Sequence, residues 1–154
     1  MVTPELPSDL KEMLLHLQHA YPNEGCGLFI KGPGGWRTRV MENAYDRYHA
    51  KDPQGFPRTA RTAYFFNPSE WLRVSTELEQ TGESVGWIVH SHADVGAYFS
   101  AEDRAMAAPE GEPLMPGVSY LVVAVDGGKV TNAKVFWWAE GTFQEAPAPV
   151  LAPG

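Results

Sequence analysis

Two histidines, a serine and an aspartate lie close together in the middle of the chain, at spacings that suit a metal site. His90 and His92 directly follow residues 85–89, an apolar run typical of a buried strand. Because residues i and i+2 of a strand share a face, we expect the two imidazoles side by side. Ser100 is a predicted helix N-cap, and Asp103 follows in the first turn of that helix. Two imidazoles and a carboxylate are the ligand set of an open zinc site, whose fourth position holds water.

The same residues resemble the signature of the JAMM (MPN-plus) metalloprotease family. That signature is a Glu far upstream, then His-[Ser/Thr]-His, seven residues, Ser, two residues and Asp. His90, His92, Ser100 and Asp103 match its downstream positions. The upstream position is matched by Glu24, in a segment Glu-Gly-Cys-Gly that is similar to the E-x-C-G of small prokaryotic members.

The resemblance extends from the first predicted helix to about Trp138. It implies an α/β fold of the cytidine-deaminase-like MPN type, with a single mixed β-sheet flanked by helices. We expect a metalloprotease domain over residues 1–145 and a flexible, Pro-rich tail over residues 146–154. One departure is Ala93, where many members have Pro; this changes the stiffness of the loop but removes no ligand.

The resemblance also implies a role for each site residue. His90, His92 and Asp103 would hold Zn²⁺. Glu24, which on local evidence is an ordinary solvated residue at a strand entry, would be the general base that accepts a proton from water and delivers it to the leaving amine. The Ser100 hydroxyl would stabilise the oxyanion of the tetrahedral intermediate.

The substrate is implied by the resemblance alone. It would be a ubiquitin-like or sulfur-carrier protein, cleaved at a peptide or isopeptide bond after its C-terminal Gly-Gly. An extended tail of this kind could pair as a strand with a sheet edge, for which residues 44–61 are our candidate. The alternative is a non-catalytic MPN-type interaction scaffold. Such proteins typically lose ligands, and none is missing here.

Composition excludes several other classes of protein. The chain has 154 residues, enough for one domain, and a net charge of −7 argues against a nucleic-acid surface. Its single cysteine, Cys26, rules out an internal disulfide and the Cys pair of a nucleoside deaminase, and is best interpreted as a small buried hydrophobe. No apolar run approaches the roughly 20 residues of a membrane span, and no signal peptide is evident, so we expect a cytoplasmic protein. The oligomeric state is left open.

The remaining pattern predicts the elements that must position the site. The expected helices are residues 8–21 with Ser8 as cap, 67–80 and 100–108; the expected strands are 25–31, 36–43, 62–66, 85–89, 118–125, 129–139 and a short edge at Phe143. Residues 44–61 are predicted to be a polar connection that borders the substrate channel. Leu114 and Met115, in the irregular segment 109–117, either contact substrate or pack onto the core. Asp94 and Glu102 are expected to be solvated.

Overall fold

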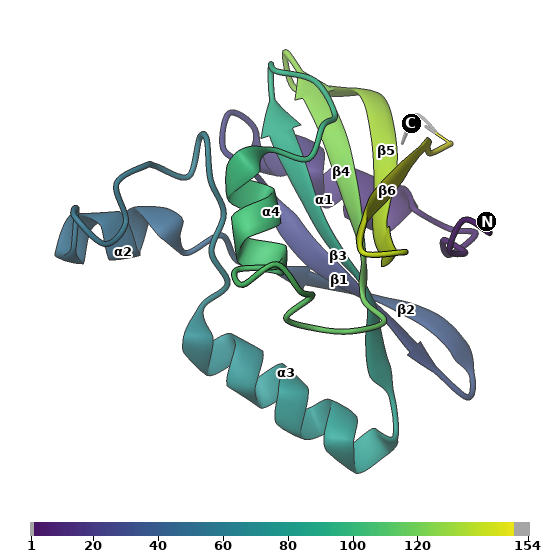
Figure 1. Ribbon diagram of the computed structural model, residues 1–154. Helices are drawn as coiled ribbons and strands as arrows, with labels where there is room; N and C mark the ends of the chain where they lie inside the picture. The colour runs from purple at the N-terminus through teal and green to yellow at the C-terminus, as the bar shows by residue number, and fades with distance from the viewer. Residues whose placement is uncertain (1, 150–154) are drawn as a thin grey trace.

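A single mixed β-sheet with helices on both faces forms the protein (Figure 1), as expected from the sequence. The computed structural model describes residues 2–149. Its helices are α1 (Lys11–Ala20), α2 (Tyr45–Lys51), α3 (Pro68–Thr81) and α4 (Ala101–Ala107). Its strands are β1 (Cys26–Gly32), β2 (Gly35–Met41), β3 (Ser84–Ala93), β4 (Ser119–Asp126), β5 (Lys129–Ala139) and β6 (Thr142–Pro147).

The order of strands in the sheet is β2-β1-β3-β4-β5-β6. Only β3 and β4 are parallel, and α4 lies in the connection between them; every other neighbouring pair is antiparallel. The β1–β2 and β4–β5 hairpins close at glycine-rich turns, in which Gly35 and Gly127 have positive φ angles that a residue with a Cβ rarely adopts. The two histidines extend the predicted strand, so that β3 runs on to Ala93.

Two hydrophobic cores occupy the two faces of the sheet. Helix α1 covers one face, where Met13 and Leu17 pack with the odd-numbered side chains of the central strands, such as Trp87 and Leu121. Helices α3 and α4 cover the other face, where the even-numbered Ile88 packs. Because side chains alternate along a strand, His90 and His92 share the face of Ile88 and lie beneath α4.

Helix α3 follows the sequence prediction closely. The Asn67 side chain accepts a hydrogen bond from the Ser69 N–H at 2.9 Å, Pro68 occupies the first turn, and Gly82 ends the helix in the left-handed conformation. The predicted cap of the first helix is wrong. Helix α1 begins at Lys11, whose N–H donates to the Asp9 carboxylate at 3.0 Å, so Ser8 lies too far upstream to cap it.

The prediction for residues 44–61 was partly wrong, because this segment contains α2 and, in the described part of the chain, no strand that offers a sheet edge. Tyr45 and Tyr48 of α2 pack on Phe56 and Phe65, an aromatic cluster too irregular in spacing to give a helical pattern. The predicted strand over residues 62–66 is reduced to one bridge, between Asn43 and Phe66.

The prediction placed the start of the C-terminal tail, residues 146–154, two residues too early. Ala146 and Pro147 belong to β6 and pair with β5, since an edge strand tolerates proline where no ladder hydrogen bond is required of it. Residues 150–154 of that tail lie outside the described residues. Within residues 2–149, no helix is long and apolar enough to cross a membrane.

Candidate metal centre

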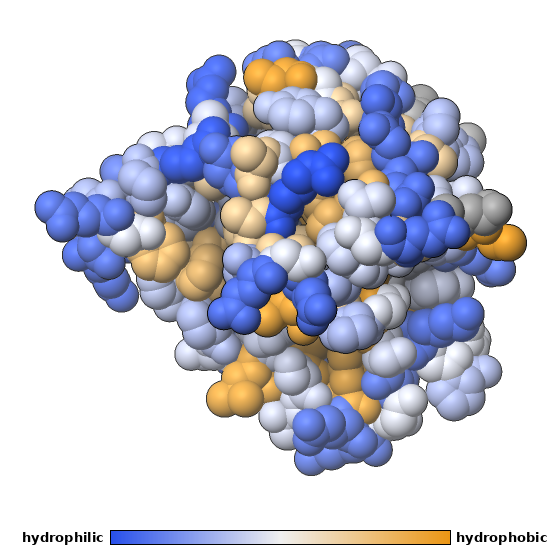
Figure 2. Space-filling view, viewed as in Figure 1, coloured by the Kyte–Doolittle hydropathy of each residue, from blue (hydrophilic) through white to orange (hydrophobic). Residues whose placement is uncertain are grey.

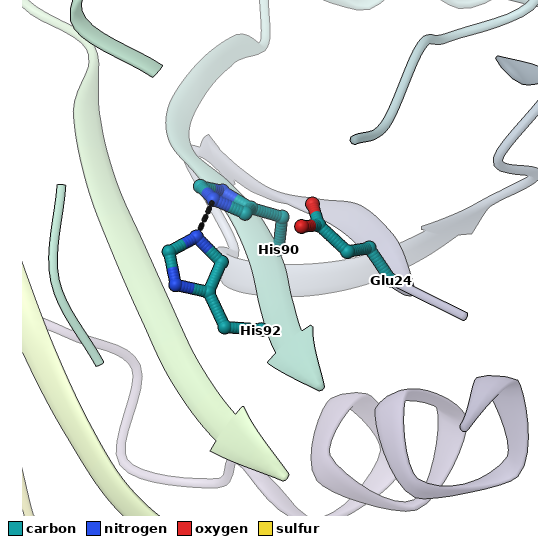
Figure 3. A group of neighbouring side chains, drawn as sticks. All are labelled: Glu24, His90 and His92. Atoms are coloured by element: carbon teal, nitrogen blue, oxygen red, sulfur yellow. Dashed lines mark hydrogen bonds between the residues drawn. The ribbon is translucent and has the colours of Figure 1, made fainter. Parts of the chain in front are cut away.

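Pairing between β1 and β3 brings the carboxylate of Glu24 to the histidines. Cys26 pairs with His90, and the ladder continues one step further through a 3.0 Å hydrogen bond from the Ser91 N–H to the Gly25 carbonyl. Glu24 therefore comes opposite His92, although the two residues are far apart in the sequence. Figure 3 shows the Glu24 carboxylate pointing toward the two imidazole rings. One ligand atom from each of Glu24, His90 and His92 lies within 4.8 Å of the others, and this buried group could bind a metal ion.

Asp103 joins the histidines from α4. Its Oδ2 atom lies 3.2 Å from His90 Nε2 and 3.3 Å from His92 Nε2, and the two Nε2 atoms are 3.3 Å apart. These three atoms form a nearly equilateral triangle. A tetrahedral site with metal–ligand bonds of about 2.0–2.1 Å has edges of about 3.3 Å, so the triangle has the size of one face of a zinc coordination tetrahedron.

Hydrogen bonds orient two of these three side chains. The His92 Nδ1–H donates to the Gly96 carbonyl at 3.0 Å, which fixes the ring with Nε2 facing Asp103. Asp103 Oδ2 accepts the Ser100 N–H at 3.0 Å, and the Asp103 N–H donates to Ser100 Oγ at 3.0 Å. This reciprocal capping box confirms Ser100 as the N-cap of α4 and fixes the Asp103 carboxylate on the histidines.

The two carboxylates of the site experience opposite electrostatic surroundings. Burial, and then the negative charge of Asp103, raises the pKa of Glu24 to about 9, although Arg58 opposes this shift. Burial also acts to raise the pKa of Asp103, but the charge of His90 and hydrogen bonds from His90, His92 and Ser100 outweigh it and lower this pKa well below its ordinary value. Asp103 is thus an anion that favours a neighbouring cation, and Glu24 is a carboxyl able to hold a proton near neutral pH.

Other residues singled out in the sequence take structural roles near the site. Cys26 is fully buried, which raises the pKa of its thiol and suits a small hydrophobe. Asp94 is exposed, as predicted, and accepts hydrogen bonds from the Tyr21 hydroxyl and the Gly127 N–H. Glu102 is also exposed, as predicted, and forms a 2.8 Å ion pair with Arg58 from the end of segment 44–61. The end of that segment therefore lies against the first turn of α4, next to Asp103.

Sequence reasoning missed three residues that contact the centre. Tyr64 stacks on His90, with ring centroids 4.5 Å apart, and Tyr98 meets the His92 ring edge-on at 4.7 Å. The Asn43 amide donates to the Glu24 carbonyl at 2.8 Å. No local pattern marks these residues, because each reaches the site through a tertiary contact. Tyr98 alone lies inside the recognised motif.

An apolar cavity of about 330 Å³ lies on the same face of the sheet as the histidines. Its floor includes Ile88, two residues before His90, and one of its walls is Tyr64. In Figure 2 apolar surface gathers between the lower end of α4 and α3, bordered by hydrophilic side chains. Leu114 and Met115 both line this cavity: Leu114 is exposed at its rim, whereas Met115 packs against the core.

Comparisons with known proteins agree with this architecture. The desampylase of Haloferax volcanii is 26% identical over 129 residues, which cover 84% of this chain and 79% of that protein. A solution structure of a Desulfitobacterium hafniense protein superposes with a TM-score of 0.60 at 23% identity, covering 90% of this chain and 85% of that one. One from Salinibacter ruber gives 0.55 at 20% identity, covering 96% and 90%. These two similarities concern the fold alone. The family described as prokaryotic homologs of the JAB domain matches residues 7–140, which include all five residues of the motif, and the chain belongs to that family.

Proposed function

We propose that this protein is a zinc-dependent hydrolase that cleaves a peptide or isopeptide bond after the C-terminal Gly-Gly of a ubiquitin-like or sulfur-carrier protein. The observation that carries the proposal is the triangle of His90 Nε2, His92 Nε2 and Asp103 Oδ2, with edges of 3.2–3.3 Å. The proposed catalytic domain is the predicted residues 1–145 together with the last two residues of β6, Ala146 and Pro147.

His90, His92 and Asp103 are the proposed ligands of the metal. Glu24 lies within 4.8 Å of the imidazole nitrogens but forms no ion pair with them among the described residues. The triangle with Asp103 has the shorter edges, which favours Asp103 as the third ligand and leaves Glu24 beside the metal site. Zinc held by three protein ligands lowers the pKa of a bound water toward neutrality and polarises a carbonyl group.

Glu24 is the proposed general base. Glu24 is buried, with 5% of the residue exposed, and its carboxyl group faces the histidines, so a proton that it accepts is sheltered from bulk solvent. It would take that proton from the attacking water and deliver it to the leaving amine. A cation among the ligands would offset the charge of Asp103, which is one of the groups that raise the pKa of Glu24.

Ser100 is the proposed donor to the oxyanion that forms at the scissile carbonyl. Its Oγ atom accepts the Asp103 N–H, and a hydroxyl group can donate its own proton while it accepts. One such donor contributes about 3 kcal/mol to transition-state stabilisation, or a hundredfold or more in rate.

The proposed substrate follows from two lines of support. One relative is named a desampylase, which favours a ubiquitin-like protein as the substrate. The apolar cavity lined by Ile88 and Tyr64 suits an apolar side chain near the scissile bond, because Ile88 is about 6.6 Å along the strand from His90. A Gly-Gly sequence would let the main chain approach the buried ligands without side-chain clashes.

The test is cleavage of a ubiquitin-like protein that carries a C-terminal extension after its Gly-Gly. We expect zinc-loaded protein to release the extension and chelated protein not to do so. Glu24→Gln should retain zinc but lose activity by about 10²–10⁴-fold, the usual contribution of a general base. Glu79→Gln makes the same chemical change at an exposed position of α3 and should have no effect.

Two results would refute the proposal. If the fully zinc-loaded wild type cleaves no substrate of this class, the non-catalytic scaffold becomes the better interpretation. If Glu24→Gln cleaves as fast as wild type, Glu24 is not the base. Replacing Gly-Gly by Ala-Ala in the substrate tests specificity separately, since equal cleavage of both substrates would remove the proposed Gly-Gly requirement.

A further inference from the structure

His90 differs from the other two proposed ligands in how its side chain is held. The ring is fully buried, and its Nδ1 atom has no hydrogen-bond partner among the described residues. His92 and Asp103, by contrast, are oriented by hydrogen bonds to Gly96 and Ser100. A metal-binding histidine is almost always oriented by a hydrogen bond from its second ring nitrogen. The χ2 torsion of histidine is soft, so another contact must fix the plane of this ring.

Tyr64 supplies a contact of the required kind. Its ring lies over the His90 ring at 4.5 Å between centroids and 21° between planes, a stacked arrangement. Tyr64 is 5% exposed, and its other neighbours include Phe66, which meets it edge-on at 5.6 Å. Rotation of the His90 ring about χ2 would turn its edge into the face of Tyr64. The stack therefore opposes the one torsion that aims Nε2.

Tyr64 is in turn fixed from both sides by a single amide. Asn43 Nδ2 donates to the Ala63 carbonyl at 3.0 Å, and Asn43 Oδ1 accepts the Phe65 N–H at 3.2 Å. These bonds hold the residues immediately before and after Tyr64. The Asn43–Phe66 bridge extends the attachment by one residue. The tyrosine ring is thus presented to His90 by a backbone segment that is anchored at each end.

We infer that Tyr64 is a positioning residue that orients His90 for metal binding, with its aromatic face taking the place of the hydrogen bond that His90 lacks. This inference rests on the proposed metal site. It assigns the effect to the ring of Tyr64 and not to its hydroxyl group. It also assigns to Tyr64 a role separate from that of Phe66, a neighbouring aromatic residue that stacks on Trp71.

The experiment measures metal binding and not hydrolysis. The dissociation constant for Zn²⁺ is obtained by competition with a chromophoric chelator for wild type, Tyr64→Phe, Tyr64→Leu and the control Phe66→Leu. Tyr64→Leu should bind zinc about 10–100-fold more weakly, as is usual when the residue that orients a ligand is lost. Tyr64→Phe and Phe66→Leu should bind zinc as wild type does. The visible absorption of the Co²⁺-loaded proteins, which reports ligand geometry, should change in Tyr64→Leu alone.

Each contrary result is informative. Wild-type zinc affinity and an unchanged Co²⁺ spectrum in Tyr64→Leu would overturn the inference. So would a loss in Tyr64→Phe equal to that in Tyr64→Leu, because the hydroxyl group would then be responsible, or an equal loss in Phe66→Leu, because general packing would then explain it. If Tyr64→Leu does not fold, Tyr64→Met fills the space without an aromatic face and is judged by the same criteria. Failure of the wild type itself to bind zinc would instead overturn the proposed function.

Discussion

Asn43 is a residue whose loss should lower both the stability of the fold and the rate of catalysis. Its amide uses both donors and both acceptors: Nδ2 donates to the Glu24 and Ala63 carbonyls at 2.8 and 3.0 Å, and Oδ1 accepts from the Tyr45 and Phe65 N–H groups at 3.0 and 3.2 Å. The side chain therefore joins the entry to β1, the start of α2 and the segment that carries Tyr64.

Asn43→Ala removes these four hydrogen bonds, and a longer contact of 3.5 Å to the Ala60 carbonyl, and leaves their backbone partners partly buried. At about 0.5–1.5 kcal/mol each, the loss in free energy of unfolding should be about 2–6 kcal/mol. Total stabilities of about 5–15 kcal/mol leave room for the variant to fold. Because the Glu24 carbonyl loses its hydrogen bond from Asn43, kcat should also fall, and a displacement of about 1 Å costs about a hundredfold.

Urea unfolding measures the loss in free energy of unfolding. Cleavage of the Gly-Gly fusion, at a temperature where the variant is folded, measures the fall in kcat. Asn43→Asp keeps the two accepted bonds but places a carboxylate against the Glu24 and Ala63 carbonyls, so it should be no more stable than Asn43→Ala. Asn67→Ala is the control, because it removes a single N-cap bond on α3 and should cost about 1 kcal/mol without lowering kcat. The reasoning is refuted if Asn43→Ala loses no more stability than Asn67→Ala.

Four further predictions concern the metal, a thiol, pH and the cavity. Removing zinc with a chelator should lower the melting temperature, since zinc at a thousand times its Kd stabilises the folded state by about 4 kcal/mol; an unchanged melting curve would contradict a metal site. Cys26→Ala should retain cleavage, and the native thiol, fully buried and with a raised pKa, should react with a thiol reagent only on unfolding. A hydrogen bond from Arg37, and then one from Thr81, lowers the pKa of Glu83. This carboxylate therefore stabilises the fold above its unfolded pKa of about 4.3, and the effect is lost as pH falls through the lower, folded pKa. The difference in urea midpoint between wild type and Glu83→Gln should accordingly be larger at pH 7 than at pH 3. Leu114→Asp, at the exposed rim of the cavity, should raise KM for the fusion substrate and leave its melting temperature unchanged; an unchanged KM would exclude the cavity from substrate binding.

The part of the site that depends on local geometry could be predicted from the sequence. The i, i+2 spacing of His90 and His92 places both rings on one face of β3. Ser100 and Asp103 form the predicted cap of α4, because a capping box needs only residues three apart. In the same way Asn67 and Gly82 bound α3 as expected. Each of these predictions uses contacts within one strand or one turn of helix.

The parts that failed depend on contacts between segments far apart in the chain. Helix α2 was missed because its seven residues make only about two turns, too few to show a periodic apolar pattern, and its aromatic side chains pack on Phe56 and Phe65 outside the helix. The sheet edge predicted within residues 44–61 is absent, because part of this segment folds as α2 and the rest is loop. Glu24 was found only through the family resemblance, since nothing near it in the sequence distinguishes it from a solvated strand-end residue.

Tyr64 and Asn43 show why a motif alone gives an incomplete description of such a centre. The motif specifies which atoms can bind a metal, whereas the plane of His90 and the main chain at Glu24 are held by residues outside it. Asn43 contributes to both restraints, because its side-chain amide hydrogen-bonds to the Glu24 carbonyl and to the backbone of the residues that flank Tyr64. A substitution at Asn43 should therefore disturb the proposed base and the proposed ligand together. A substitution at Tyr64 should disturb the ligand alone, so comparison of the two variants separates the contribution of the metal from that of the base.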